Sequence, residues 1–397
     1  MTAAISAARG GGRVFIAEGN DILGKKILAS GNGRCNLSNL RLDLKRYQGS
    51  AKELAPKALA CFSVQDTIHF FDEIGIPIIA AASARGDDSW LYPRVKEASA
   101  VRQALAMACE EAGVNILLNT KIDGIKKKKD GFVLSAGNSI LEADRIILAG
   151  GGCGAPKSGS DGSGYALAES LGHRLIKPLP ALGALISPAP FLKQIGGQRA
   201  EASLKLVIDN QITMGESGEV QFTAYGLSGI PVFQLSGAAA RALEEKRKVS
   251  LMLDFYPERK EEELSAELLR RRNLFGSQES GSLLRGLIPD KIIPSLLKLA
   301  GIRLHIPLNT VPDKSIEALA CLLKKLVFPV EAHKGFESCQ TVSGGIPGDE
   351  VKDTLESRLC PGLFLAGEIL DIDGPCGGYN LQWAWSSGYL AGRGASA

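Results

Sequence analysis

The stretch Gly362-Leu363-Phe364-Leu365-Ala366-Gly367-Glu368 precedes Asp371-Ile372-Asp373-Gly374 and then Gly377-Gly378-Tyr379-Asn380-Leu381-Gln382. The first segment has the composition of a short buried strand that gives way to small residues and a carboxylate, and the double glycine opens a predicted helix over 381–390. A helix N-terminus carries about half a positive charge and free N–H groups, so it suits a flat, negatively charged ligand. The pattern predicts a bound dinucleotide such as a flavin nucleotide, although the glycines alone also fit a plain tight turn.

The other end of the chain has the pattern of a nucleotide-binding β-α-β unit. Residues 2–9 are rich in alanine and predict a helix that ends at three glycines, and residues 13–18 predict a buried strand ending in Glu18. An acid at this place accepts hydrogen bonds from ribose hydroxyls in such units. The strand and glycine-rich turn that should precede the helix are absent, so we expect a truncated or mis-started sequence.

Residues 24–39 form a loop that is dense in small residues, amides and cations. Backbone N–H groups and the Arg34 side chain could supply donors to a pyrophosphate or ribityl chain. An ordinary surface turn rich in asparagine and glycine is the alternative.

The rest of the first 180 residues alternates helices with short strands. Helical spacing covers 51–59, 63–74, 101–112 and 165–171, and strand patterns cover 114–118, 121–127, 131–135 and 139–142. We interpret those four strands as a small β-meander and the apolar strand 145–149, which ends in three glycines, as part of a parallel sheet. His173, just past the last helix, is interpreted as a cap or packed side chain rather than a base.

Residues from about 181 to 337 change character and predict an inserted domain. Strands over 203–208 and 249–255 predict an antiparallel sheet, and the helices predicted over 260–275 and 292–300 place a helical subdomain near 257–303. The sequence pattern of a strand returns at 340–345. The predicted fold is therefore α/β: a Rossmann-like dinucleotide-binding domain, 1–180 and 338–397, interrupted by a β-rich and helical domain, 181–337.

Composition excludes several classes of protein. The 397 residues carry 46 basic and 43 acidic side chains, a net charge of +3, which gives no reason to expect a nucleic-acid partner. No apolar stretch reaches the ~20 residues that span a bilayer, and no signal peptide is evident, so we expect a cytoplasmic protein. The eight cysteines lack Cys-x-x-Cys spacing, which argues against a metal site or a disulfide framework and favours small buried hydrophobes.

Three motifs in this order, 30–36 (Ser-Gly-Asn-Gly-Arg-Cys-Asn), 367–374 and 378–382, give the chain a specific resemblance to the BaiN/YhiN-like flavoproteins. The resemblance extends to Tyr92-Pro93, to 222–229 and to 341–345, and so covers nearly the whole chain. It implies an FAD enzyme of the two-dinucleotide-binding-fold type with an inserted cap. The chain departs from the family in lacking the N-terminal glycine-rich loop and in having 94–97 after Tyr92-Pro93, where Ser and Lys are expected.

The resemblance also implies which residues contact FAD, and these are Glu18, Lys26, Ser30, Gly31, Gly33, Arg34, Cys35, Asn36, Gly367, Asp373, Gly378, Asn380 and Leu381. Members of the family are linked to reduction of the unsaturated ring of 3-oxo bile acids, and others to oxidation of small amines such as aminoacetone.

The leading hypothesis is an NAD(P)H-dependent reductase in which NADH or NADPH reduces FAD, and flavin N5 then gives hydride to a conjugated ketone. The alternatives are an oxidase of small amines and a non-catalytic flavin-binding protein. A proton donor is required, and Tyr92, Tyr225 and Tyr379 are the candidates, so catalysis stays unassigned. The sequence does not predict an oligomeric state.

Overall fold

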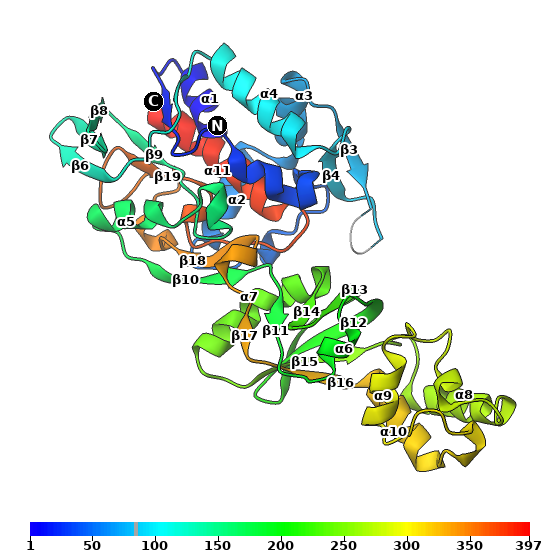
Figure 1. Cartoon of the computed structure of the whole chain (residues 1–397). Coiled ribbons are helices and arrows are strands. Elements are labelled where there is room, and N and C mark those ends of the chain that lie inside the picture. The colour runs from blue at the N-terminus through cyan, green and yellow to red at the C-terminus, as the bar shows by residue number, and fades with distance from the viewer. Residues whose placement is uncertain (83–85) are drawn as a thin grey trace. The chain divides into compact units, whose positions relative to one another are not determined.

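The computed structural model describes residues 1–82 and 86–397, and the chain divides into two compact units. Unit 1 combines Met1–Ala181 with Phe336–Ala397, and unit 2 is Leu182–Gly335. In Figure 1 the blue N-terminal segment and the red C-terminal helix therefore lie in the same unit. Among the described residues, no helix is both long enough and apolar enough to cross a membrane.

Unit 1 contains two parallel strand pairs. Strand β1 (Phe15–Ala17) pairs with β5 (Asn115–Leu117), and β9 (Ile146–Leu148) pairs with β19 (Leu363–Leu365). Parallel pairs need a crossover connection, and helix α4 (Ala98–Glu111), which directly precedes β5, supplies part of one. The pairing confirms the Rossmann-like character. It also corrects the prediction for residues 114–118, because this strand joins β1 and not the meander.

Two helices from opposite ends of the chain pack together at the centre of unit 1. Helix α1 (Thr2–Arg9) and helix α11 (Tyr379–Ser396) run in the same direction, with Gly388 against Thr2 and Gly392 against Ser6. Small residues let the two backbones approach closely. Ser6 Oγ also donates to the Tyr389 carbonyl oxygen over 2.9 Å. The C-terminal helix is thus an integral part of unit 1 (Figure 1).

The remaining elements of unit 1 surround these pairs. The meander consists of β6 (Gly124–Lys128), β7 (Gly131–Ala136) and β8 (Ser139–Ala143), and a second antiparallel sheet has the order β2-β4-β3. The other elements are β2 (Ser38–Asn39), β3 (Ile78–Ala81), β4 (Trp90–Pro93), α2 (Ala55–Cys61), α3 (Val64–Glu73), α5 (Ser163–Ser170), and the antiparallel pair β10 (Ile176–Ala181) and β18 (Thr341–Gly345). A hydrogen-bonded capping box at Ser63 and Asp66 begins α3.

Unit 2 is built on a seven-stranded antiparallel sheet of order β16-β15-β12-β13-β14-β11-β17. Its strands are β11 (Leu185–Ile186), β12 (Arg199–Ile208), β13 (Gln211–Thr223), β14 (Gly226–Ser228), β15 (Val249–Asp254), β16 (Leu326–Val330) and β17 (Ala332–His333). Strand β15 alternates buried and half-buried residues, as expected when one face of a sheet packs on a core.

Unit 2 also contains helices, some of which pack on this sheet. They are α6 (Leu192–Ile195), α7 (Ile230–Glu244), α8 (Glu261–Leu274), α9 (Ile293–Leu299) and α10 (Asp313–Lys324). The sequence analysis did not predict α7 or α10. Because α10 spans Asp313–Lys324, the helical part of unit 2 extends well beyond residue 303. A signal was present, because Ile316, Leu319 and Leu323 have helical spacing and all are buried.

Candidate functional site

The loop between β1 and β2 has an unusual backbone. A 3-10 segment, Lys25–Gly33, is interrupted at Gly31 and Asn32, whose φ angles are +56° and +57°. A Cβ on Gly31 would also meet the Asn36 amide nitrogen, so only glycine fits there. A turn of this kind can present backbone N–H groups to an anion. Residues 32–34 are exposed, whereas Cys35 has no exposed surface and belongs to the core beneath the loop.

Lys26 connects this loop to the C-terminal motif. Its Nζ lies 2.5 Å from Oε2 of Glu368, and Glu368 Oε1 accepts a hydrogen bond from Thr341 Oγ1 over 3.0 Å. The Lys26 side chain is 30% exposed and that of Glu368 is 15% exposed. A pair so shielded from water holds its geometry better than a surface pair. The bond therefore fixes the position of Gly367 relative to the loop.

The N-terminus of α11 is packed tightly against the same loop region. Gly378 has a φ of +88°, and a Cβ there would overlap the Ser38 carbonyl oxygen. Beside it, Asn39 Nδ2 donates to the Gly377 carbonyl oxygen over 3.0 Å. The N-cap residue is Gly378, which has no side chain to accept from the N–H groups of the first turn.

The Asn380 side chain fixes the turn before this helix through two hydrogen bonds. Asn380 Oδ1 accepts from the Gly374 amide over 2.9 Å, and Asn380 Nδ2 donates to the Gly374 carbonyl oxygen over 2.8 Å. Asn380 thus holds both backbone groups of one residue. The structure gives this predicted cofactor contact a role in forming the turn.

A buried hydrogen-bond hub anchors α11 behind the turn. Gln382 has no exposed surface, and its Oε1 accepts from Ser38 Oγ over 2.5 Å and from Thr67 Oγ1 over 3.0 Å. Its Nε2 donates to Ser386 Oγ over 2.9 Å. A buried amide whose donors and acceptors are both bonded fixes the helix in one orientation.

Glu18 ends β1, where the sequence predicts a ribose-binding acid. Its Oε1 accepts from the backbone and side-chain nitrogens of Asn20, over 2.9 and 2.7 Å. Both bonds hold the carboxylate at the end of the strand. Asn20 also approaches Gly159, where a Cβ would overlap its amide nitrogen.

These residues fit a dinucleotide. At the first turn of α1, the Thr2 side chain is buried and its hydroxyl has no hydrogen-bond partner among residues 1–82 and 86–397. The uncapped start of α11 and the left-handed turn at 31–33 would add further donors on the same unit. Each of these groups would gain a partner from phosphate or flavin oxygens. The site is thus rich in unused donors and compatible with FAD.

The structure brings most of the predicted residues to one region of unit 1. Ion pairing joins Lys26 to the segment of Gly367, packing joins β2 to Gly378, and Asp373 pairs with Gln48 through backbone hydrogen bonds. Ser30 Oγ turns back to the Ile27 carbonyl oxygen, and Leu381 is half-buried against the core of this unit. The sequence reading did not assign Glu368 or Gln382, because their partners lie more than 300 positions away along the chain.

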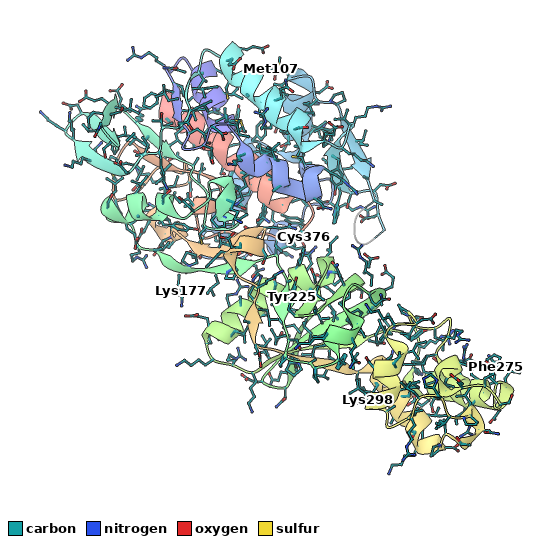
Figure 2. The ribbon with its side chains drawn as sticks, in the orientation of Figure 1. Met107, Lys177, Tyr225, Phe275, Lys298 and Cys376 are labelled. Atoms are coloured by element: carbon teal, nitrogen blue, oxygen red, sulfur yellow. The ribbon has the colours of Figure 1, made fainter. Side chains whose placement is uncertain are left out.

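The three candidate tyrosines have different surroundings. The Tyr379 hydroxyl accepts from the Asp43 amide over 3.0 Å, and its carbonyl oxygen accepts from the Tyr47 hydroxyl over 2.8 Å. Tyr225 belongs to unit 2 (Figure 2). Lys334 Nζ lies 4.0 Å from the centre of its ring. Tyr92 is on β4, which pairs with β2 and whose Trp90 packs against Gly377 of the turn.

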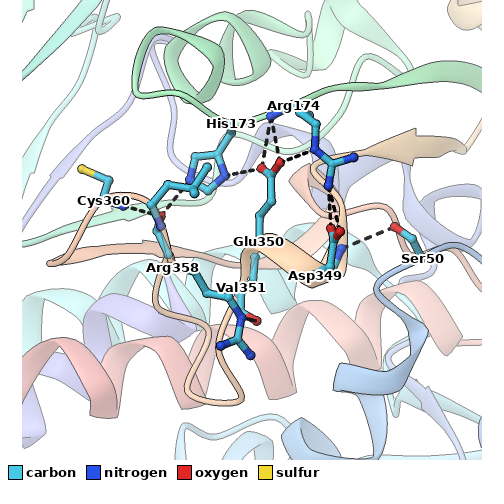
Figure 3. Close-up of polar contacts among 11 residues, drawn as sticks. Ser50, His173, Arg174, Asp349, Glu350, Val351, Arg358 and Cys360 are labelled. Atoms are coloured by element: carbon cyan, nitrogen blue, oxygen red, sulfur yellow. Dashed lines mark hydrogen bonds and ion pairs between the residues drawn. The ribbon is translucent and has the colours of Figure 1, made fainter.

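A second polar cluster in unit 1 is structural. His173 Nδ1 and Nε2 contact Glu350 Oε2 at 2.8 Å and Ser357 Oγ at 2.9 Å, and Arg174 Nε donates to Glu350 Oε1 over 2.7 Å (Figure 3). His173 is fully packed, as predicted. The cluster holds the connection between β18 and β19. In the part of the chain that the structure describes, no three His, Cys, Asp or Glu side chains are arranged to hold a metal ion.

Comparisons with known proteins agree with this geometry. The profile of the HI0933-like protein Rossmann domain matches residues 1–394. The chain is 40% identical to the 3-dehydro-bile acid delta(4,6)-reductase of Clostridium scindens, covering 100% of this chain and 96% of that protein. It is 27% identical to the ribosomal RNA dihydrouridine synthase of Escherichia coli, covering 98% and 93%.

Solved structures show a related fold. The 3-ketosteroid delta1-dehydrogenase of Sterolibacterium denitrificans matches with a TM-score of 0.50 and 11% identity, covering 100% of this chain and 97% of that one. A quinol fumarate reductase from E. coli matches with a TM-score of 0.50 and 14% identity, covering 100% and 68%. At these identities the likeness concerns the fold alone.

Proposed function

The chain belongs to the HI0933-like Rossmann family of flavoproteins, and we propose that it is an FAD-dependent reductase of ring double bonds conjugated to a ketone, as in 3-oxo bile acids. The observation that carries this proposal is the 40% identity, over the whole chain, to a protein named as a bile-acid reductase. Bound FAD would supply hydride to the β-carbon of the conjugated ketone.

The residues of the chain would bind and orient this cofactor. The exposed loop at 32–34 and the N-terminus of α1 would face its phosphates, and Glu18 would accept from the adenosine ribose. The uncapped first turn of α11 would place N–H groups beside the flavin oxygens and stabilise negative charge there. NADH or NADPH is the proposed source of electrons.

The E. coli relative supports the reaction type and supplies a second candidate substrate. Formation of dihydrouridine also reduces a carbon–carbon double bond conjugated to a carbonyl group. The lower identity of 27% and the near-neutral net charge of +3 place RNA second. Oxidation of small amines remains a third proposal, supported by the sequence resemblance alone.

Anaerobic absorbance spectroscopy of FAD-loaded protein tests these proposals. NADH or NADPH should bleach the flavin, and a 3-oxo-4-ene bile acid should restore its colour and yield the saturated ketone. Reoxidation by a uridine-containing rRNA transcript instead, with formation of dihydrouridine, would select the second candidate. Peroxide released from aerobic protein with aminoacetone and no nicotinamide would select amine oxidation. A flavin that neither nicotinamide bleaches would contradict the proposed reductase.

A further inference from the structure

Tyr92 lies where three segments of the candidate site meet. On β4, the backbone of Leu91 pairs with Ser38, and the Leu91 carbonyl oxygen accepts from the Leu37 amide over 2.8 Å. One residue earlier, the Trp90 indole packs against Gly377 so closely that a Cβ on that glycine would overlap it. Strand β4 is therefore fixed both to the loop after β1 and to the turn before α11.

The Tyr92 side chain is buried next to charged and polar groups of these two segments. Tyr92 is 8% exposed. Arg34 and Cys35 belong to the loop that leads into β2, the strand paired with β4, and Cys376 belongs to the turn that packs on Trp90, and these three residues influence the ionisation of Tyr92. Cys376 is the residue directly before the double glycine (Figure 2). Among residues 1–82 and 86–397, the Tyr92 hydroxyl makes no hydrogen bond, in contrast to the hydroxyls of Tyr47, Tyr256 and Tyr379.

We propose that Tyr92 is the acid that completes the reduction, with Arg34 as the residue that stabilises the phenolate left behind. This inference rests on the proposed function. Hydride adds to the β-carbon of the conjugated ketone and makes an enolate. The electron pair of the enolate forms a C–H bond at the α-carbon, the O–H bond of Tyr92 breaks, and the phenolate then takes a proton from water. The substrate gains one hydride and one proton, so charge and electrons balance.

The surroundings of the phenol suit this role. Burial raises the pKa of Tyr92, so the hydroxyl carries its proton throughout the neutral range, and the nearby Arg34 charge opposes that rise. A free phenol with an adjacent cation can give up a proton only when a strong base such as an enolate is present. The Tyr379 hydroxyl differs from that of Tyr92 in accepting from the Asp43 amide, and its ring packs edge-on against Tyr47.

The Y92F variant tests this assignment, with flavin reduction and flavin reoxidation measured separately. Flavin reduction by NAD(P)H should stay within about twofold of wild type, and reoxidation by a 3-oxo-4-ene bile acid should slow by about 10²–10⁴-fold, the usual contribution of a positioned acid. The matched control is Y389F, which removes a phenol from a stacked ring pair on α11 and should leave both rates unchanged. C376A tests the neighbouring thiol as the rival donor and should retain most of the reoxidation rate.

A second measurement does not depend on turnover. In oxidised protein containing 3-fluorotyrosine, the fluorine resonance that Y92F removes should shift when the bile acid is added, whereas the resonance that Y389F removes should not. Wild-type reoxidation of Y92F, or a Tyr92 resonance unmoved by the bile acid, would overturn the assignment of Tyr92 and leave the proposed function standing. A wild-type flavin that the bile acid cannot reoxidise would overturn the proposed function itself, and the assignment with it.

Discussion

Lys26 and Glu368 are 342 positions apart in the chain, yet Nζ of the first lies 2.5 Å from Oε2 of the second. This pair joins the N-terminal loop to the C-terminal motif in a partly shielded place. Replacing Lys26 with methionine leaves the Glu368 carboxylate without its cation, so we expect unfolding free energy to fall by about 1–2 kcal/mol. Urea unfolding of the FAD-free protein measures this loss, and FAD titration should show weaker binding.

The control for K26M is K128M, which removes one half of the pair that Lys128 forms with Glu142. Both side chains of that pair are more than half exposed, at 57% and 69%. The fall in unfolding free energy should be clearly smaller for K128M than for K26M. Equal losses in the two variants would mean that Lys26 is an ordinary surface cation.

Gly378→Ala should loosen the start of α11. The substitution carries the cost of a positive φ, about 1–2 kcal/mol, and adds an overlap with the Ser38 carbonyl oxygen. Gly172→Ala is the matched control, because Gly172 has a φ of +96° but open space around a Cβ. We expect G378A to lower the melting temperature further than G172A and to release FAD more readily. Identical melting temperatures would show that the close approach is unimportant.

His173→Ala should destabilise unit 1. It leaves the buried Glu350 carboxylate and the Ser357 hydroxyl without one partner each and opens a cavity. Together these effects predict a loss of about 2–4 kcal/mol in urea unfolding. His69→Ala, at an exposed position on α3, should change the unfolding free energy little. A His173 variant as stable as the His69 variant would contradict the structural role of the cluster.

Unit 2 should lose stability in mild acid because of His333. Burial lowers the pKa of His333 to about 4, below the value of about 6.5 in an unfolded chain. The unfolded state therefore binds more protons between these values, so the contribution is complete above pH 6.5 and is lost as the pH falls toward 4. Because the ring is only partly enclosed, we expect a loss on the order of 1 kcal/mol.

Unfolding of wild type and H333Q at pH 7.5 and pH 4.5 measures the His333 contribution. The glutamine oxygen can still accept from the Gly335 amide, which donates to His333 Nδ1 over 3.0 Å, but it does not titrate. The variant should lose less stability than wild type between the two pH values. Parallel losses would assign the acid sensitivity to other groups.

Local sequence signals predicted the elements that their own residues determine. Helix α1 and the turn before α11 appear where alanine and glycine indicate them, and the strands predicted at 121–127, 131–135 and 139–142 form the meander. The strand at 114–118 was assigned to the meander because it is next to it in sequence. Its parallel pairing with β1 depends on a long crossover, which periodicity does not encode.

The sequence located the segments that form the site but not the contacts between them. Glycine and amide patterns located the loop and the turn, because a backbone that approaches a ligand needs those residues. Nothing in the neighbourhood of Lys26 or Ser38 indicates Glu368 or Gln382 as a partner, since these contacts form only when the two chain ends meet. Tyr92 was one of three equal candidates until the pairing of β2 with β4 placed it beside Arg34.

The discontinuity of unit 1 has a consequence for biosynthesis. Strand β9 can pair with β19, and α1 can pack against α11, only after the C-terminal residues have been synthesised. The flavin site therefore cannot form until the ribosome has released almost the entire polypeptide. Unit 2 is complete in the nascent chain some sixty residues earlier. During that interval the apolar faces that α11 and β19 later cover remain exposed, and such surfaces favour aggregation of a nascent chain.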